Sequence, residues 1–203
     1  MRYKKWTELR ASANRIQVEL HQLHLDENLA DGRVPYLPHH GVSGQKSGKL
    51  RVVFDGSSSF RGISLNDSLL QGPDLTTPLV DVLVRFRQER VAFIGDVETM
   101  FYQVHVPRED RDLLRFLWWP GGDTTLAPEV YRMTVHPFGA CSSPSVANFA
   151  LRRTAEDFGD DFLPVTKRTV NDHFYVDDCL KSVETVEEAV EVVGELRELC
   201  QKG

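Results

Sequence analysis

The sequence predicts an α+β fold in which helices pack on one face of a mainly antiparallel sheet. Strand-like and helix-like patterns alternate from residue 50 to residue 203. Two pairs of strand-like runs are separated mainly by turn residues or acids, which favours antiparallel hairpins over parallel crossovers. The final pattern is amphipathic at helical spacing, as expected for a helix that covers a sheet.

The N-terminal part of the chain shows little regular pattern. Residues 1–30 are mixed polar, and a few apolar residues are spaced as in one short amphipathic helix: Ile16, Val18, Leu20 and Leu23. Turn-forming Gly, Pro, Asp and Ser fill residues 31–49, which predicts a loop with one extended piece at 34–37. Residues 1–33 therefore form a poorly assigned segment.

Three elements are expected between residues 50 and 96. The β-branched run 50–54 predicts a strand. Thr77 and Pro78 mark a helix start with proline in the first helical position, and apolar residues follow at helical spacing: Leu79, Val82, Leu83 and Phe86. The continuous apolar run 91–94 predicts a strand covered on both faces, which leads directly into Asp96.

The second half of the chain has clearer patterns. Runs 113–119 and 130–135 predict an antiparallel pair. Ser142 to Pro144 cap a helix with three inward residues: Val146, Phe149 and Ala150. Residues 174–183 predict a strand region interrupted by two aspartates. A capping box of Thr185 and Glu188 starts the last helix, with an apolar stripe: Val186, Ala189, Val190, Val193 and Leu196.

The glutamates of that last helix are expected to form a solvated face: Glu184, Glu187, Glu188, Glu191, Glu195 and Glu198. His136 and His173 flank two of the motifs described below, and we expect both to be hydrogen-bonded structural histidines. His39 and His40 are adjacent, but no third ligand lies at zinc spacing.

Composition excludes several classes of protein. The 203 residues carry a formal net charge of −6, which is not the basic balance of a free-standing nucleic-acid binder. No uncharged apolar run reaches the roughly 18 residues that predict a membrane span, and no signal peptide is visible. The three cysteines lie far apart, which argues against a disulfide scaffold. We expect an intracellular protein, in the cytoplasm or in virus-like particles.

The informative residues are three acids where apolar strands end. Asp96 follows the run 91–94, and Asp177 and Asp178 interrupt 174–183. Adjacent acids repel each other, and a cation relieves that repulsion. Carboxylate oxygens are preferred ligands of Mg²⁺. If the two strands are neighbours, the acids converge and can hold two ions about 3.5–4 Å apart for phosphoryl transfer. The alternative is an ordinary acidic turn at the surface.

Four motifs, in this order, resemble those of reverse transcriptases. Residues 50–55 resemble a fingers strand with a triphosphate-binding base, and 93–101 the first carboxylate motif. Residues 137–140 with Ser142-Ser143-Pro144 resemble the PFG and SP motif, and 175–178 the YxDD box. Further sequence segments within about residues 34–203 resemble the polymerase of BEL/Pao-type LTR retrotransposons: Tyr36 to His40, Ser64 to Asp67, Leu70 to Leu75, and Phe116 to Trp119.

The resemblance implies a right-hand polymerase with fingers over 34–90 and palm over 91–203, and with the thumb absent. It implies an RNA-directed DNA polymerase that uses two Mg²⁺ ions (Mn²⁺ is an alternative), dNTPs, and an RNA or DNA template with a primer. No membrane partner is expected. The parent element is expected to supply the rest of a Pol polyprotein, with thumb, RNase H and integrase, so that this chain is an incomplete piece.

The resemblance also implies residue roles. Asp96 and Asp177 match metal ligands together with the Val97 carbonyl, and Asp178 matches the third catalytic acid. Phe101 matches a steric gate against the 2′-OH. The other matches concern the nucleotide and the primer end: Arg51 with Lys49 or Lys46 for the triphosphate, Phe138 and Gly139 for the nucleotide pocket, and Tyr175 and Val176 for the primer.

Two alternatives stay open at this point. A non-catalytic remnant of a retroelement would fold and at most bind RNA or a protein partner. An unrelated metal-dependent phosphotransferase would require that the four ordered motifs arise by coincidence. The intact acids Asp96, Asp177 and Asp178 favour the polymerase, whereas the missing thumb favours the remnant.

Overall fold

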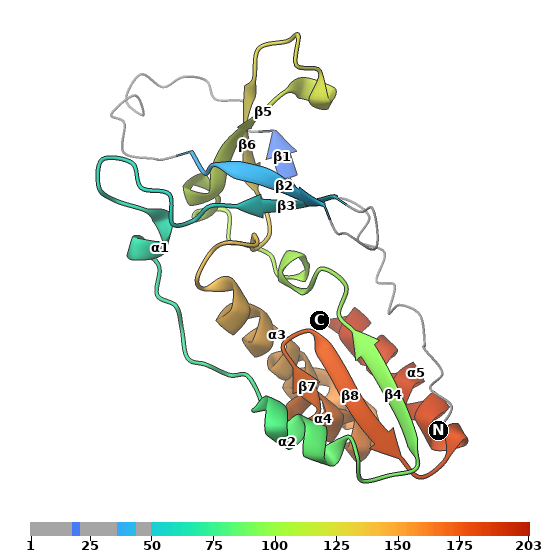
Figure 1. The fold of residues 1–203 in the computed structure, drawn as a ribbon. Helices are drawn as coiled ribbons and strands as arrows, with labels where there is room; N and C mark the ends of the chain where they lie inside the picture. The colour runs from blue at the N-terminus through green and yellow to red at the C-terminus, as the bar shows by residue number, and fades with distance from the viewer. Residues whose placement is uncertain (1–17, 21–35, 44–49) are drawn as a thin grey trace. The chain divides into compact units, whose positions relative to one another are not determined.

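The structure of the chain is a computed structural model that describes residues 18–20, 36–43 and 50–203 (Figure 1). Two compact units alternate along the sequence. Among the described residues, unit 1 comprises 73–100 and 144–203, and unit 2 comprises 18–20, 36–43, 50–72 and 101–143. Each unit has its own hydrophobic core.

Unit 1 is built on a three-stranded antiparallel sheet in the order β4-β8-β7 (Figure 1). β4 (Val91–Asp96) pairs along its whole length with β8 (Asp178–Val183), and β7 (Phe174–Tyr175) pairs with the start of β8. The expected strands at 91–94 and 174–183 are therefore confirmed, and the second of them is a tight hairpin. This register ends β4 opposite the beginning of β8.

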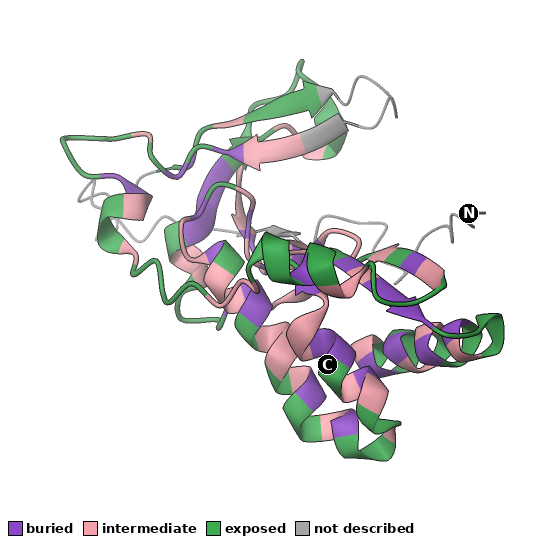
Figure 2. Ribbon diagram, turned by 60° about the horizontal axis from the view of Figure 1, so that its bottom comes forward, coloured by how far each residue is buried: buried purple, intermediate pink, exposed green. Residues whose placement is uncertain are grey.

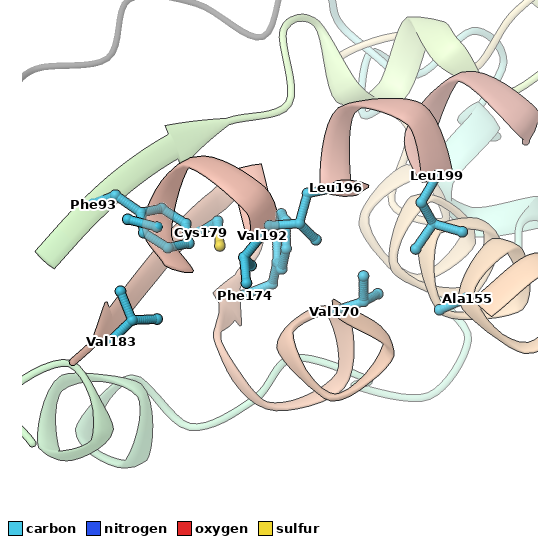
Figure 3. Close-up of a cluster of buried hydrophobic side chains, with 10 residues drawn as sticks. Phe93, Ala155, Val170, Phe174, Cys179, Val183, Val192, Leu196 and Leu199 are labelled. Carbon is cyan, nitrogen blue, oxygen red and sulfur yellow. The ribbon is translucent and has the colours of Figure 1, made fainter. Parts of the chain in front are cut away.

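The described residues of unit 1 contain the helices α2 (Leu79–Arg85), α3 (Ser143–Phe158), α4 (Pro164–Asp172) and α5 (Val186–Lys202). A single 3₁₀ turn, Gly159–Asp161, connects α3 towards α4. Figure 3 shows the core between the sheet and the helices α3, α4 and α5, where Phe93, Cys179 and Val183 lie near side chains of α5 such as Val192 and Leu196. Buried and exposed residues alternate around the helices (Figure 2), as amphipathic helices require.

Unit 2 contains a three-stranded antiparallel sheet in the order β1-β6-β5 and a two-stranded sheet β2-β3. The strands are β1 (Val18–Leu20), β6 (Glu129–Met133), β5 (Arg115–Trp118), β2 (His39–Ser43) and β3 (Leu50–Phe54). Short helical pieces are α1 (Leu65–Ser68) and three 3₁₀ turns at Met100–Gln103, Arg111–Leu114 and Pro120–Gly122. The β5–β6 pair confirms the expected antiparallel hairpin.

Several expectations about unit 2 are wrong. Residues 18–20 form a strand paired with β6 instead of part of a helix, and the rest of that prediction lies outside the described residues. β2 occupies 39–43 where a loop is expected, because backbone pairing with β3 overrides the weak local signal of Gly41. Of the extended piece at 34–37, only Tyr36 and Leu37 are described, and they lie outside any strand.

Some side chains of unit 1 that were expected to face the core are exposed. Ile94 is 48% exposed, so β4 is not covered on both faces. Phe149 is 60% exposed, because α3 turns Ala147 and Asn148 inward instead. In α5 the exposed Val186 and Val190 are not part of the core stripe, which runs at the spacing of one helix face: Ala189, Val192, Leu196 and Leu199.

Candidate active site

Three carboxylates converge at one end of the unit 1 sheet. Asp96 is the last residue of β4 and is the direct cross-strand partner of Asp178, the first residue of β8. Asp177 lies in the turn between β7 and β8. One carboxylate oxygen from each of the three residues lies within 4.8 Å of the others. The structure thus brings together the three acids that the sequence singled out.

The backbone around these acids is strained in a way that fixes their position. Val176, the first residue of the two-residue β7–β8 turn, has φ of 56°, and Thr99, just after β4, has φ of 52°. A β-branched residue pays a steric cost in this left-handed region, of order 1–2 kcal/mol. The Val97 N–H donates to the Asp177 carbonyl oxygen at 2.9 Å and ties the end of β4 to the turn. Strain that the surrounding fold maintains is typical of functional sites.

The acids lie in an electrostatically unfavourable arrangement. Partial burial, and next the negative charge of Asp177, raise the pKa of the Asp178 carboxyl above its ordinary value. The raised pKa means that the fold disfavours the charged form of this group. A divalent cation bound between the carboxylates would reverse that preference.

The donor set fits a hard divalent cation. Mg²⁺ binds oxygen ligands and commonly takes one or two carboxylates together with water and substrate phosphates. Asp96, Asp177 and Asp178 offer three oxygens close enough to share one or two such ions. Val97 directly follows Asp96, and a metal-binding role for its carbonyl stays a prediction.

The two phenylalanines predicted for the nucleotide pocket, Phe101 and Phe138, lie in contact in unit 2. The rings of Phe101 and Phe138 are 4.6 Å apart and tilted by 43°, and the Tyr102 ring meets Phe138 edge-on at 5.2 Å. The Tyr102 hydroxyl donates to the Val52 carbonyl at 3.2 Å. Tyr102 therefore links the Phe101–Phe138 pair to β3.

Gly139 is required by a close approach of two backbones. Its φ is +113°, and an added Cβ would lie 1.7 Å from the carbonyl oxygen of Phe54. The Phe54 N–H donates to the Phe138 carbonyl oxygen at 3.0 Å in the same contact. No side chain fits between these segments, so the glycine sets the path of the loop.

The other predicted residues are those expected to contact the triphosphate and the primer. Arg51 lies in β3 opposite Val42, whereas Lys46 and Lys49 lie outside the described residues. Tyr175 is exposed in β7 and pairs with Asp178. The roles proposed for these residues towards triphosphate and primer stay predictions.

Sequence reasoning missed Asn66, whose side chain bonds to the Gly139 loop. A signal for its surroundings was present, because Ser64 and Asp67 have the spacing of a capping box. Both reciprocal bonds of that box are formed at the start of α1.

The flanking histidines are half-buried. Burial lowers the pKa of His136. Burial, and next the Lys181 cation, lower the pKa of His173 to about 4. The His173 Nε2 atom lies 3.5 Å from the Lys181 Nζ, whereas its Nδ1 atom is buried without a hydrogen-bond partner in the described part of the chain. His39 packs against the rings of Phe54, Phe116 and Trp118.

Solved structures with the same fold identify its class. The chain is similar to the foamy viral protease-reverse transcriptase in complex with double-stranded DNA, with a TM-score of 0.62 and 17% identity over 82% of this chain and 25% of that one. It is also similar to that protein in complex with an RNA/DNA hybrid, with a TM-score of 0.59, 16% identity, and coverage of 82% and 19%. The fold is thus reverse-transcriptase-like, and the chain spans a quarter or less of these neighbours.

No model of a protein family and no curated protein matches the sequence. The native prototype foamy virus protease-reverse transcriptase gives a TM-score of 0.57 at 19% identity. At this level of identity the likeness defines the fold. Within the described residues, no helix has both the length and the apolar character needed to cross a membrane.

Proposed function

We propose that this chain is the fingers and palm part of an RNA-directed DNA polymerase from an LTR retrotransposon of the BEL/Pao type. The observation that carries the proposal is the convergence of Asp96, Asp177 and Asp178 on one point of an antiparallel sheet. The reverse-transcriptase-like fold supports it, and so does the order of the four sequence motifs.

The proposed reaction is the attack of a primer 3′-OH on the α-phosphate of a dNTP. One P–O bond forms and another breaks, and pyrophosphate leaves. Asp96 and Asp177 would hold Mg²⁺, and Asp178 would support them. When bound, Mg²⁺ stabilises the charge on the attacking and leaving oxygens.

The resemblance gives further residues roles towards the nucleotide and the primer. The Phe101 ring packs under the sugar, leaves no room for a 2′-OH and selects deoxynucleotides. Phe138 and Gly139 line the pocket, and Arg51 with Lys49 contacts the triphosphate, since a guanidinium is matched to phosphate oxygens. Tyr175 and Val176 contact the primer end. The partners are a primed RNA or DNA template and the dNTP.

Primer extension tests the proposal. The chain is incubated with a primed RNA template, dNTPs and Mg²⁺, beside Asp177→Asn and a matched control, Asp160→Asn. Asp160 is exposed and pairs with Lys167. We expect Asp177→Asn to lose at least about 100-fold in rate, as is typical for loss of a group that stabilises transition-state charge. Asp160→Asn should extend like the parent chain.

Two further results bear on the proposal. No extension by the parent chain, or equal extension by Asp177→Asn, would contradict it. The retrotransposon origin is tested separately by reading the coding frame downstream of residue 203. Thumb and RNase H sequence in that frame is the expected result, and an unrelated domain would overturn the origin.

A further inference from the structure

One side-chain amide in unit 2 bridges two points of the Gly139 loop. The Asn66 Nδ2 donates to the Gly139 carbonyl oxygen at 3.0 Å. The Asn66 Oδ1 accepts from the Cys141 N–H at 2.9 Å. The amide therefore uses both of its ends on residues that are two apart, as a neighbouring strand would.

Asn66 is itself held from several sides. Its own N–H donates to the Gly56 carbonyl oxygen at 2.8 Å, and its Nδ2 lies 3.0 Å from the Ser57 hydroxyl. Asn66 is the second residue of α1, whose start is fixed by the capping box of Ser64 and Asp67. A side chain with this many constraints forms a rigid support, because its rotamer is not free to change.

The space around the amide leaves no room for another residue at Gly56. An added Cβ there would lie 2.5 Å from the Gly139 carbonyl oxygen and 2.8 Å from Asn66 Oδ1. Gly56 is buried. Two glycines, Gly56 and Gly139, thus let the backbones approach until one amide can connect them.

The loop that Asn66 holds carries Phe138. Phe138 precedes Gly139 directly, and its ring lies 4.6 Å from that of Phe101. The Phe138 carbonyl is fixed by the Phe54 N–H on one side, and Asn66 fixes the next peptide on the other. A shift of the Gly139 peptide would therefore move the Phe138 ring relative to Phe101.

We infer that Asn66 is a positioning residue for the nucleotide pocket: its amide holds the Gly139 loop so that Phe138 stays against Phe101. This inference rests on the proposed function, in which these two rings bind the incoming nucleotide. Asn66 touches the loop and not the nucleotide. Its loss should raise the KM for dNTP and weaken discrimination against ribonucleotides, while kcat stays near its original value.

The test is Asn66→Asp in the full chain, with steady-state primer extension. The substitution preserves shape and the acceptor for Cys141, but it places a carboxylate oxygen against the Gly139 carbonyl. We expect the KM for dNTP to rise about tenfold, since an unsatisfied or repelled polar group commonly costs that much in binding. Ser57→Ala, which removes only an outer contact, should stay within about twofold, because surface changes of this kind cost little.

Amide hydrogen exchange supplies a second readout that does not depend on activity. In Asn66→Asp, peptides covering 138–143 should exchange faster, whereas peptides of β8 in unit 1 should exchange at the parent rate. An unchanged KM, or unchanged exchange over 138–143, overturns the inference. A loss of kcat together with faster exchange throughout the chain indicates a role in folding alone and also overturns it.

The experiment also separates this inference from the proposed function. If the parent chain extends no primer, the proposed polymerase activity fails, and the role of Asn66 towards a nucleotide fails with it. Exchange over 138–143 still decides whether the amide holds the loop. If the parent chain is active and Asn66→Asp binds dNTP equally well, only the inference about Asn66 is wrong.

Discussion

Asp96 and Asp178 are direct cross-strand partners at the point where β4 ends and β8 begins. Like charges directly opposite each other destabilise a sheet. Asp177, one residue earlier, adds a third carboxylate to the same place. The repulsion among these carboxylates destabilises the folded chain when no cation is bound. Because the fold gains no stability from it, the arrangement indicates a function for the charges.

The repulsion gives a prediction for Asp178→Asn. Because the folded pKa of Asp178 is raised, the unfolded chain loses this proton at lower pH than the folded chain does, so the free energy of unfolding falls as pH rises through that interval. Asp178→Asn in EDTA should therefore be more stable than the parent above this interval, by a few tenths to about 1 kcal/mol. Urea unfolding from pH 3 to pH 8 measures it.

The same variant should respond less to metal. Adding Mg²⁺ should raise the unfolding temperature of the parent chain, since a ligand that binds only the folded state stabilises it. Asp178→Asn should show a smaller rise. Asp160→Asn is the control, because it removes an exposed charge that pairs with Lys167, and it should not gain stability in EDTA. A larger Mg²⁺ response in Asp178→Asn would contradict the proposed metal site.

His173 gives a prediction of acid sensitivity. Its pKa of about 4 in the folded chain lies below the ordinary value of 6.5. Between these pH values the unfolded chain takes up a proton that the folded chain does not, so stability falls as pH falls. His173→Gln should remove on the order of 1 kcal/mol of this loss, after allowance for solvent screening. Denaturation at pH 7 and pH 4.5 gives the difference.

Several charged groups surround His173, and a histidine outside this cluster serves as the control. Its Nε2 lies 3.5 Å from Nζ of the buried Lys181, and Asp172 and Arg85 also act on its pKa. His40 is exposed in β2, and His40→Gln is the matched histidine substitution with which His173→Gln is compared. Identical pH profiles for His173→Gln and the parent chain would show that the buried ring does not titrate as expected.

The sequence predicts well where local patterns and local chemistry agree. β3, β4 and α5 have continuous β-branched or apolar runs with capping or turn signals, and each is found. The position of the acids follows from strand ends, and their convergence follows from the antiparallel register. The catalytic roles that we propose for them rest on the family resemblance.

α4 shows why other elements were missed. Its buried positions are Thr166, Thr169 and Val170. Two of these three are polar, so no continuous apolar stripe marks the helix, and Pro164 in the first turn is the main local signal. The Thr169 hydroxyl bonds to the Val165 carbonyl and can therefore be buried. Similarly, Asn66 bonds to residues more than 70 positions away, a contact that no local pattern contains.

Two glycines give opposite predictions for substitution by alanine. Gly139→Ala should unfold or strongly destabilise unit 2, by about 3 kcal/mol or more, because its Cβ overlaps the Phe54 carbonyl and its φ is +113°. Gly194 lies inside α5 with nothing within 4 Å of an added Cβ. Gly194→Ala should stabilise by about 0.5–1 kcal/mol. Urea denaturation of both variants tests the pair, and the same sign for both would contradict it.

Glu195 connects two helices and is not merely part of a solvated face. From α5 it accepts the Leu163 N–H at the start of α4, at 3.1 Å, and the hydroxyl of the fully buried Thr166. A carboxylate at a helix N-terminus also interacts favourably with the helix dipole. Glu195→Ala leaves both donors without this acceptor and should lower the free energy of unfolding by about 1–2 kcal/mol.

Two variants make that prediction specific. Glu195→Gln keeps one acceptor oxygen and should recover much of the lost stability, since a neutral acceptor makes the same hydrogen bond more weakly. Glu198 lies three residues further along α5 and is exposed, so Glu198→Ala should change the free energy of unfolding by less than about 0.5 kcal/mol. Equal unfolding midpoints for Glu195→Ala and Glu198→Ala would show that the link between α4 and α5 contributes no stability, and that Glu195 belongs to the solvated face after all.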